Sequence, residues 1–294
     1  MCGSRWIFIV VLAMACELPA HAGAADRPER VTFPSADGKT ELVGYLFKPA
    51  PMPAARVPGV VMMHGRAGAY SSRANGVYDA SSLSKRHRMW GHLWAEQGYL
   101  AILVDGFGPR GYPQGFPRFS YKQRPAEVDE VSVRPLDAYG ALAYLRSRSD
   151  VIEHRVALQG WSNGASATLA AMSIDAPGAK LTTPAGGFRA ALAFYPACGL
   201  KGRFEAGYRP YAPVQVHHGT DDEEVSPSRC AAFVNRSRAL GGDILVRLYE
   251  GATHGFDDPS PKRQRVAANA PAAGLAIRRA THFFAKWLKD GSGQ

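Results

Sequence analysis

Short apolar runs recur along the chain, and each ends in glycine, proline or another turn-forming residue. The six runs are residues 57–65, 99–108, 155–162, 188–196, 212–219 and 244–251. Because they are apolar almost throughout rather than alternating, they are typical of parallel strands that are buried on both faces. Residues 26–55 alternate instead on both sides of a turn at Asp37 and Gly38, and this pattern predicts a hairpin.

Stretches with helical spacing of apolar positions separate the predicted strands. They cover approximately residues 81–97, 135–148, 163–174, 227–240 and 271–289. The alternation of strand and helix predicts an α/β fold, a mostly parallel sheet with helices on both faces and eight strands if the hairpin joins it. Residues 26–294 contain no linker, so we expect a single domain, and the connection from Tyr195 to Tyr211 is too short for a large lid.

Residues 1–25 have the layout of a secretory signal peptide. The cationic start MCGSR precedes the apolar stretch WIFIVVLAMA, and small residues around Ala20 and Ala22 suit cleavage there. The apolar stretch is too short to span a bilayer comfortably, so we expect no membrane span in the mature form. The sequence therefore predicts a periplasmic or secreted protein, and a lipoprotein signal that ends at Cys16 fits less well.

Composition argues against several classes of function. The net charge is +10, but lysine and arginine are scattered with no run of five, so nucleic acid is not an expected partner. The chain has no H-E-x-x-H motif and no two-cysteine zinc knuckle, so we expect neither a metal nor another cofactor. Removal of the signal peptide leaves Cys198 and Cys230, for which a disulfide and two separate buried thiols are both open.

One G-x-S-x-G motif, residues 160–164, lies where a predicted strand gives way to a predicted helix. A sharp turn of this kind presents a serine nucleophile, here Ser162, and it needs the small residues Gly160 and Gly164 because strand and helix approach closely. The backbone N–H of Asn163 would then face the developing oxyanion. The motif alone is weak, since three small residues can fall at this spacing by chance.

The partners of a serine nucleophile are an acid and a histidine, which follow it in that order in sheets of this type. The loop after the fifth of the six runs supplies four carboxylates, at residues 221–224, and the loop after the last run supplies His254. Topology leaves the acid open; we favour Asp222, with Asp221 as the alternative. His217 and His218 precede this loop on a strand, where neighbouring side chains point to opposite faces, so they do not form a metal pair.

The loop after the first run is expected to donate a second hydrogen bond to the oxyanion. Its sequence places the backbone N–H of Arg66 or Ala67 in that position. Three further side chains are candidates for the substrate pocket or its surroundings, with local structural roles as the alternative: His64, Arg110 and Trp161.

Six segments in order carry a resemblance to a known family: HGRAG, RMWGHLWAEQGYLAILVDGFGPRG, GWSNGA, FYPACG, GTDDEEVSP and THGF. Over roughly residues 55–290 the chain resembles the dienelactone hydrolase family of α/β-hydrolases. The resemblance implies the α/β-hydrolase fold and a triad of Ser162, Asp222 and His254, because the acid of family members lies three residues after the loop glycine. Members with similar cysteines imply a disulfide between Cys198 and Cys230.

Residues and resemblance together favour a serine hydrolase that cleaves small-molecule carboxylic esters or lactones through an acyl-enzyme. The enzyme that named the family has cysteine at the elbow, where this chain has Ser162. A thiolate suits an activated lactone, whereas serine suits ordinary esters. The alternatives are a serine peptidase or amidase on the same fold and a non-catalytic binding protein that has kept the fold.

Overall fold

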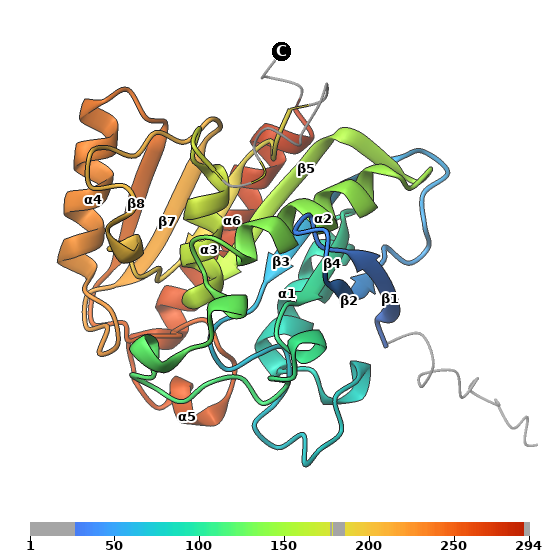
Figure 1. Ribbon diagram of the computed structural model, residues 1–294, viewed down its shortest axis with the longest axis horizontal. Coiled ribbons are helices and arrows are strands. Elements are labelled where there is room, and N and C mark those ends of the chain that lie inside the picture. Colours follow the sequence, from blue (N-terminus) through green and yellow to red (C-terminus); the bar gives the residue numbers. More distant parts are fainter. Residues whose placement is uncertain (1–26, 177, 179–185, 291–294) are drawn as a thin grey trace, which may run out of the picture.

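The structure is a computed structural model that describes residues 27–176, 178 and 186–290. The predicted signal peptide, with Cys2 and Cys16, lies outside the described residues. Within them, eight strands form one sheet in the order β1-β2-β4-β3-β5-β6-β7-β8 (Figure 1). The strands are β1 (Glu29–Pro34), β2 (Glu41–Phe47), β3 (Val57–Met63), β4 (Leu100–Asp105), β5 (Val151–Trp161), β6 (Ala191–Phe194), β7 (Val214–Gly219) and β8 (Ile244–Tyr249).

The predicted hairpin and the six predicted strands are all present, but the last of them, β8, lies at the edge of the sheet and is only partly buried, so the prediction of burial was wrong for this strand. β1 pairs antiparallel with β2, and β2 pairs antiparallel with β4, so the hairpin extends the sheet at one edge. Every other neighbouring pair of strands is parallel. Because β3 and β4 are buried along their whole lengths, neither strand could show the alternation that marks the half-exposed β1.

Helices cover both faces of the sheet, as predicted. The apolar sides of α2, α3 and α4 pack into one core on one face, and those of α1 and α6 pack into a second core on the other. None of the helices among the described residues is long and apolar enough to cross a bilayer. The helices are α1 (Lys85–Glu96), α2 (Arg134–Arg146), α3 (Asn163–Met172), α4 (Pro227–Ala239), α5 (Pro261–Gln264) and α6 (Asn269–Leu288).

The connection from β4 to α2, residues 106–133, is the longest loop over the carboxyl edge of the parallel strands. It contains only short 3-10 turns, at Gly108–Arg110, Tyr121–Gln123 and Ala126–Val128. Ligands of open α/β sheets bind at this edge, where the loops after successive strands converge. The candidate site is therefore built from loops that follow β3, β4, β5, β6, β7 and β8.

Candidate active site

Ser162 occupies a sharp turn between β5 and α3. Its backbone is held at φ 52° and ψ −115°, a conformation that serine rarely adopts and that marks a constrained functional turn. A Cβ atom on Gly164 would lie 2.1 Å from the carbonyl oxygen of Met63, and one on Gly160 would lie 2.2 Å from that of Gly164. Only glycine fits these two positions, which accounts for the spacing of the motif.

A continuous chain of hydrogen bonds joins Ser162, His254 and Asp222. The Oγ of Ser162 lies 3.0 Å from Nε2 of His254, and Nδ1 of the same ring lies 2.9 and 3.1 Å from the carboxylate oxygens of Asp222. The Asp221 side chain instead accepts a hydrogen bond from the hydroxyl of Thr220. Of the two candidate acids, the structure places Asp222 at the histidine.

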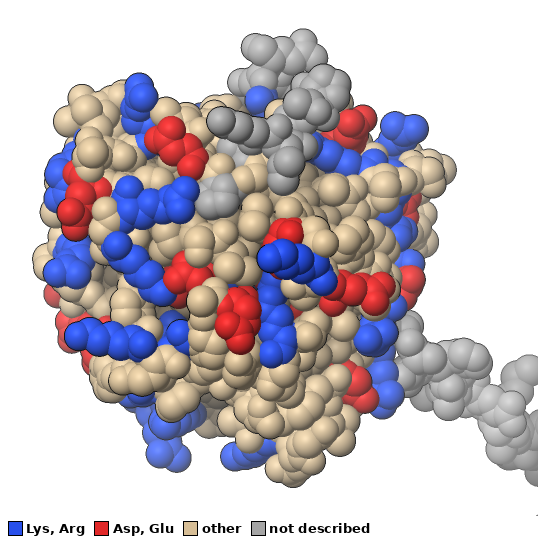
Figure 2. Space-filling view, viewed as in Figure 1, with Lys and Arg blue, Asp and Glu red and all other residues tan. Residues whose placement is uncertain are grey.

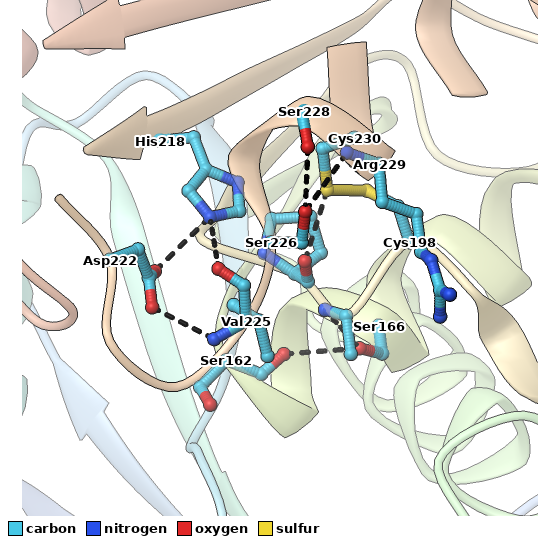
Figure 3. Close-up of a disulfide and its surroundings, with 12 residues drawn as sticks. Ser162, Ser166, Cys198, His218, Asp222, Val225, Ser226, Ser228, Arg229 and Cys230 are labelled. Carbon is cyan, nitrogen blue, oxygen red and sulfur yellow. Dashed lines mark hydrogen bonds and ion pairs between the residues drawn. A yellow bond between two sulfur atoms is a disulfide. The ribbon is translucent and has the colours of Figure 1, made fainter. Parts of the chain in front are cut away.

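Asp222 lies between the imidazoles of His254 and His218, and Figure 3 shows its contact with His218. Nε2 of the buried His218 is 3.1 Å from its carboxylate, and the backbone N–H groups of Glu224 and Val225 each donate to it at 2.9 Å. Burial raises the pKa of Asp222, but the hydrogen bonds from His218 and His254 outweigh burial and hold the pKa well below its usual range. The carboxyl is therefore ionised at neutral pH. His218 was missed as a partner of this carboxyl, although it precedes Asp222 by only four residues.

The other two carboxylates of this loop also serve the site. Oε2 of Glu223 accepts a hydrogen bond of 2.9 Å from the backbone N–H of His254, and its other oxygen pairs with Arg118 and Arg263. Glu224 makes a two-pronged ion pair with Arg66 and lies 3.8 Å from Nε2 of His254. From the sequence alone, Glu223 and Glu224 were only alternatives for the triad acid.

The Glu223→Gln variant is expected to lose stability relative to the native chain at neutral pH but not in acid. Burial raises the pKa of Glu223, yet hydrogen bonds from the N–H of His254 and from Arg263 lower it to about 2. A depressed pKa contributes stability above the unfolded value near 4.5, and this contribution is lost as the pH falls towards 2. Melting temperatures measured from pH 2 to 7 should therefore differ by a constant amount above about pH 4.5, and the difference should shrink below that pH and close near pH 2. Exposed Glu153, replaced by glutamine, is the control; a pH-independent gap for Glu223→Gln would contradict the ionic role.

The loop after β3 lies directly against the serine. A Cβ on Gly65 would be 3.4 Å from the Cβ of Ser162, so the loop approaches the turn closely. The backbone N–H groups of Arg66 and Asn163 have no protein acceptor within the described ranges. Buried Arg134 connects the loop after β3 to the start of α3. Its Nη1 donates to the carbonyl of His64 at 2.9 Å and to Oδ1 of Asn163 at 2.5 Å.

A cavity of about 300 Å³ opens beside Ser162. The predicted pocket residues His64, Arg110 and Trp161 do not line it, and this part of the prediction was wrong. Its walls come instead from the β4–α2 loop, the loop after β6 and the start of α4, and include Phe119, Tyr121, Arg124, Gly199 and Arg229. A long loop without periodicity gives no sequence signal for such a wall.

Each of the three excluded side chains is engaged elsewhere. Burial lowers the pKa of His64 far below its usual range, and the neutral ring hydrogen-bonds the carbonyl of Gly65 and the N–H of Gly106. Arg110 ties its loop to Asp37 and Asp137. The structural alternatives for these residues therefore hold.

Trp161 is fully buried and belongs to a polar cluster behind the triad. Its Nε1 and that of Trp90 both donate at 2.8 Å to one oxygen of Asp257, and the hydroxyl of Tyr195 donates to the other at 2.5 Å. The ring of Tyr195 packs against the imidazole of His254, with centroids 4.6 Å apart. This cluster connects Trp161, the residue before the nucleophile, to the loop that carries His254, and no motif in the sequence indicates it.

Cys198 and Cys230 form a disulfide, as the resemblance implied (Figure 3). It joins the loop after β6 to the first turn of α4, and Cys198 itself lines the cavity. The adjoining Ala197 donates its N–H to Oγ of Ser166 on α3 at 3.0 Å. One wall of the cavity is therefore tied both to α3 and to α4.

Comparison with family models gives a match to the dienelactone hydrolase family over residues 42–288. The chain belongs to the dienelactone hydrolase family. As a member of that family it is an ester hydrolase, and its Ser162 stands where the enzyme that named the family has cysteine.

Solved structures with the same fold include dienelactone hydrolase-like proteins and an esterase. A putative dienelactone hydrolase from Klebsiella pneumoniae is 17% identical, with a TM-score of 0.64 over 88% of this chain and 98% of that one. The dienelactone hydrolase-like promiscuous phosphotriesterase P91 from metagenomic libraries is 19% identical, with a TM-score of 0.62 over 88% and 97%. Esterase 2 of Thermogutta terrifontis is 19% identical, with a TM-score of 0.63 over 90% and 98%. At these identities the similarity shows a shared fold.

Proposed function

We propose that this protein is a serine hydrolase of carboxylic esters whose catalytic residues are Ser162, His254 and Asp222. The observation that supports it best is the hydrogen-bond chain from Oγ of Ser162 through the imidazole of His254 to the carboxylate of Asp222. Serine hydroxyl is a weak nucleophile and requires such an oriented base. The cavity beside Ser162 gives the ester a place to bind.

In the first half of the reaction His254 takes the proton of Ser162 as Oγ attacks the ester carbonyl carbon. The C=O electron pair moves to the oxygen, and the backbone N–H groups of Arg66 and Asn163 stabilise this oxyanion. Collapse of the tetrahedral intermediate breaks the bond to the alcohol, which receives its proton from His254. The ionised Asp222 holds the imidazole in orientation and stabilises the imidazolium while it exists.

In the second half water replaces the alcohol. His254 removes a proton from the water, which attacks the acyl-enzyme, and the carboxylic acid leaves as Ser162 regains its proton. A serine alkoxide-like nucleophile suits ordinary esters better than the activated lactone of the enzyme that named the family. We therefore propose unactivated carboxylic esters as the substrates.

Labelling by a fluorophosphonate probe tests the assignment. The native protein is expected to form one covalent adduct, located by peptide mass spectrometry on Ser162, because only an activated serine reacts readily with such probes. The neighbouring Ser166 makes a matched control: Ser166→Ala should still label, whereas Ser162→Ala should not. An adduct on another residue, or no adduct in protein of native fold, would overturn the proposal.

A further inference from the structure

The cavity beside Ser162 is the first of three neighbouring cavities. A second cavity, of about 490 Å³, shares four lining residues with it: Tyr121, Cys198, Gly199 and Arg229. A third, of about 260 Å³, shares four lining residues with the second: Phe204, Glu205, Phe233 and Arg236. Shared lining residues place the three cavities next to one another in a row from the serine along α4, and we call this row of cavities the α4 groove.

Two arginines on one stripe of α4 face this groove. Arg229 and Arg236 are seven residues apart, which puts them on the same side of the helix and about 10 Å apart along it. Neither guanidinium has a hydrogen-bond or ion-pair partner among the described residues; in Figure 3 the guanidinium of Arg229 extends past Cys198 without a dashed line. Figure 2 shows several Lys and Arg side chains, with Asp and Glu between them, over the part of the molecule that α4 occupies.

A third arginine adds to the positive charge at the serine end. Arg124 bonds only the hydroxyl of Ser120 and lies over the ring of Tyr121, with no carboxylate at ion-pair distance in the ranges that the structure describes. The carboxylates of the first cavity are already engaged, Glu224 by arginines and Glu130 by Lys201. Three cations without a carboxylate at ion-pair distance among the described residues therefore follow the groove, together with one carboxylate, Glu205, which lines the second and third cavities.

An aromatic side chain stands exposed at the serine end of the groove. Phe119 is 73% exposed and has φ 60°, a strained conformation for a bulky residue. The fold holds the ring beside the first cavity although burial elsewhere would be favourable. An exposed aromatic face next to polar groups suits a ligand with both apolar CH faces and hydrogen-bonding edges, as sugar rings have.

We propose that the substrate is an ester carried on an acidic oligosaccharide chain, which lies along the α4 groove. Its carboxylates meet Arg124, Arg229 and Arg236, a sugar ring stacks on Phe119, and the ester reaches Ser162. Arginines spread along a helix are matched by a ligand that carries negative charges at intervals, and a single compact anion does not have such charges. This inference rests on the proposed role of Ser162 for the position of the ester, but binding in the groove does not depend on hydrolysis.

Fluorescence anisotropy of end-labelled hexagalacturonate with the purified protein measures binding without turnover. Unlabelled hexagalacturonate is expected to compete at least about tenfold better than galacturonate or maltohexaose, because a longer charged chain meets more arginines. Added salt should weaken this binding. Equal competition by the monomer or by the neutral hexamer would overturn the proposal.

Single variants locate the binding on α4. Arg229→Gln and Arg236→Gln should each weaken binding about threefold to fivefold, and the double variant about tenfold or more. Arg238→Gln is the matched control, because Arg238 lies on the same helix but outside the cavities, and it should change affinity less than about 1.5-fold. An equal loss in Arg238→Gln would show general charge attraction and overturn the proposal. A failure of fluorophosphonate labelling would leave these binding results intact, so the two proposals fail separately.

Discussion

Replacement of Asp222 by asparagine is expected to lower kcat for ester hydrolysis by about 10⁴-fold, with little change in KM. The carboxylate accepts a hydrogen bond from Nδ1 of His254, which leaves Nε2 free to take the proton of Ser162. An amide at this position can donate to Nδ1 and so stabilise the wrong tautomer of the ring. It also removes the negative charge that stabilises the imidazolium in the transition state.

The neighbouring carboxyl, Asp221, provides the matched control for Asp222→Asn. Asp221→Asn changes an exposed carboxyl one residue away and is expected to alter kcat less than about twofold, since surface charges interact weakly. Turnover of p-nitrophenyl acetate by both variants, together with circular dichroism to establish that each is folded, makes the comparison. A tenfold or larger loss in Asp221→Asn, with Asp222→Asn nearly active, would reverse the assignment of the acid.

The sequence was sufficient for the sheet, its helices and the relation of Ser162 to His254. Those inferences depend on periodicity and on chain order, which local patterns record directly. The buried second half of β5 and the glycines around Ser162 carry the strongest of these signals, and each glycine reflects a steric demand at a single place.

The surroundings of the triad could not be predicted in the same way. The four consecutive carboxylates at 221–224 cannot be distinguished by residue type. In the structure, however, Asp222 contacts an imidazole, Glu223 accepts a hydrogen bond from a backbone N–H and Glu224 pairs with Arg66. The contact that each carboxylate makes depends on the direction in which the loop backbone points its side chain. That direction is set by contacts with distant loops. The cavity wall formed by residues 106–133 depends likewise on long-range contacts such as the ion pairs of Arg118.

Replacement of Gly164 by alanine is expected to destabilise the protein by about 3 kcal/mol or more, which corresponds to a loss of roughly 6 to 12 °C in Tm. The added Cβ would lie 2.1 Å from the carbonyl oxygen of Met63 and 2.4 Å from that of His64. Both obstacles are backbone atoms at the end of β3, so no side-chain rotation can relieve the contact. The turn at Ser162 must move away from the loop of Arg66, and activity should fall with stability.

Gly274 provides the matched control of opposite sign. It lies inside α6, and the nearest atom to its added Cβ is Nη1 of Arg278 at 3.6 Å, an ordinary contact with a flexible side chain. Glycine in a helix costs conformational entropy in folding, so Gly274→Ala should raise stability by about 0.5 to 1 kcal/mol and leave ester turnover unaltered. Thermal unfolding of the two variants side by side measures both effects. A Gly164→Ala protein as stable as the native chain would contradict the close approach of α3 to the end of β3 at this turn.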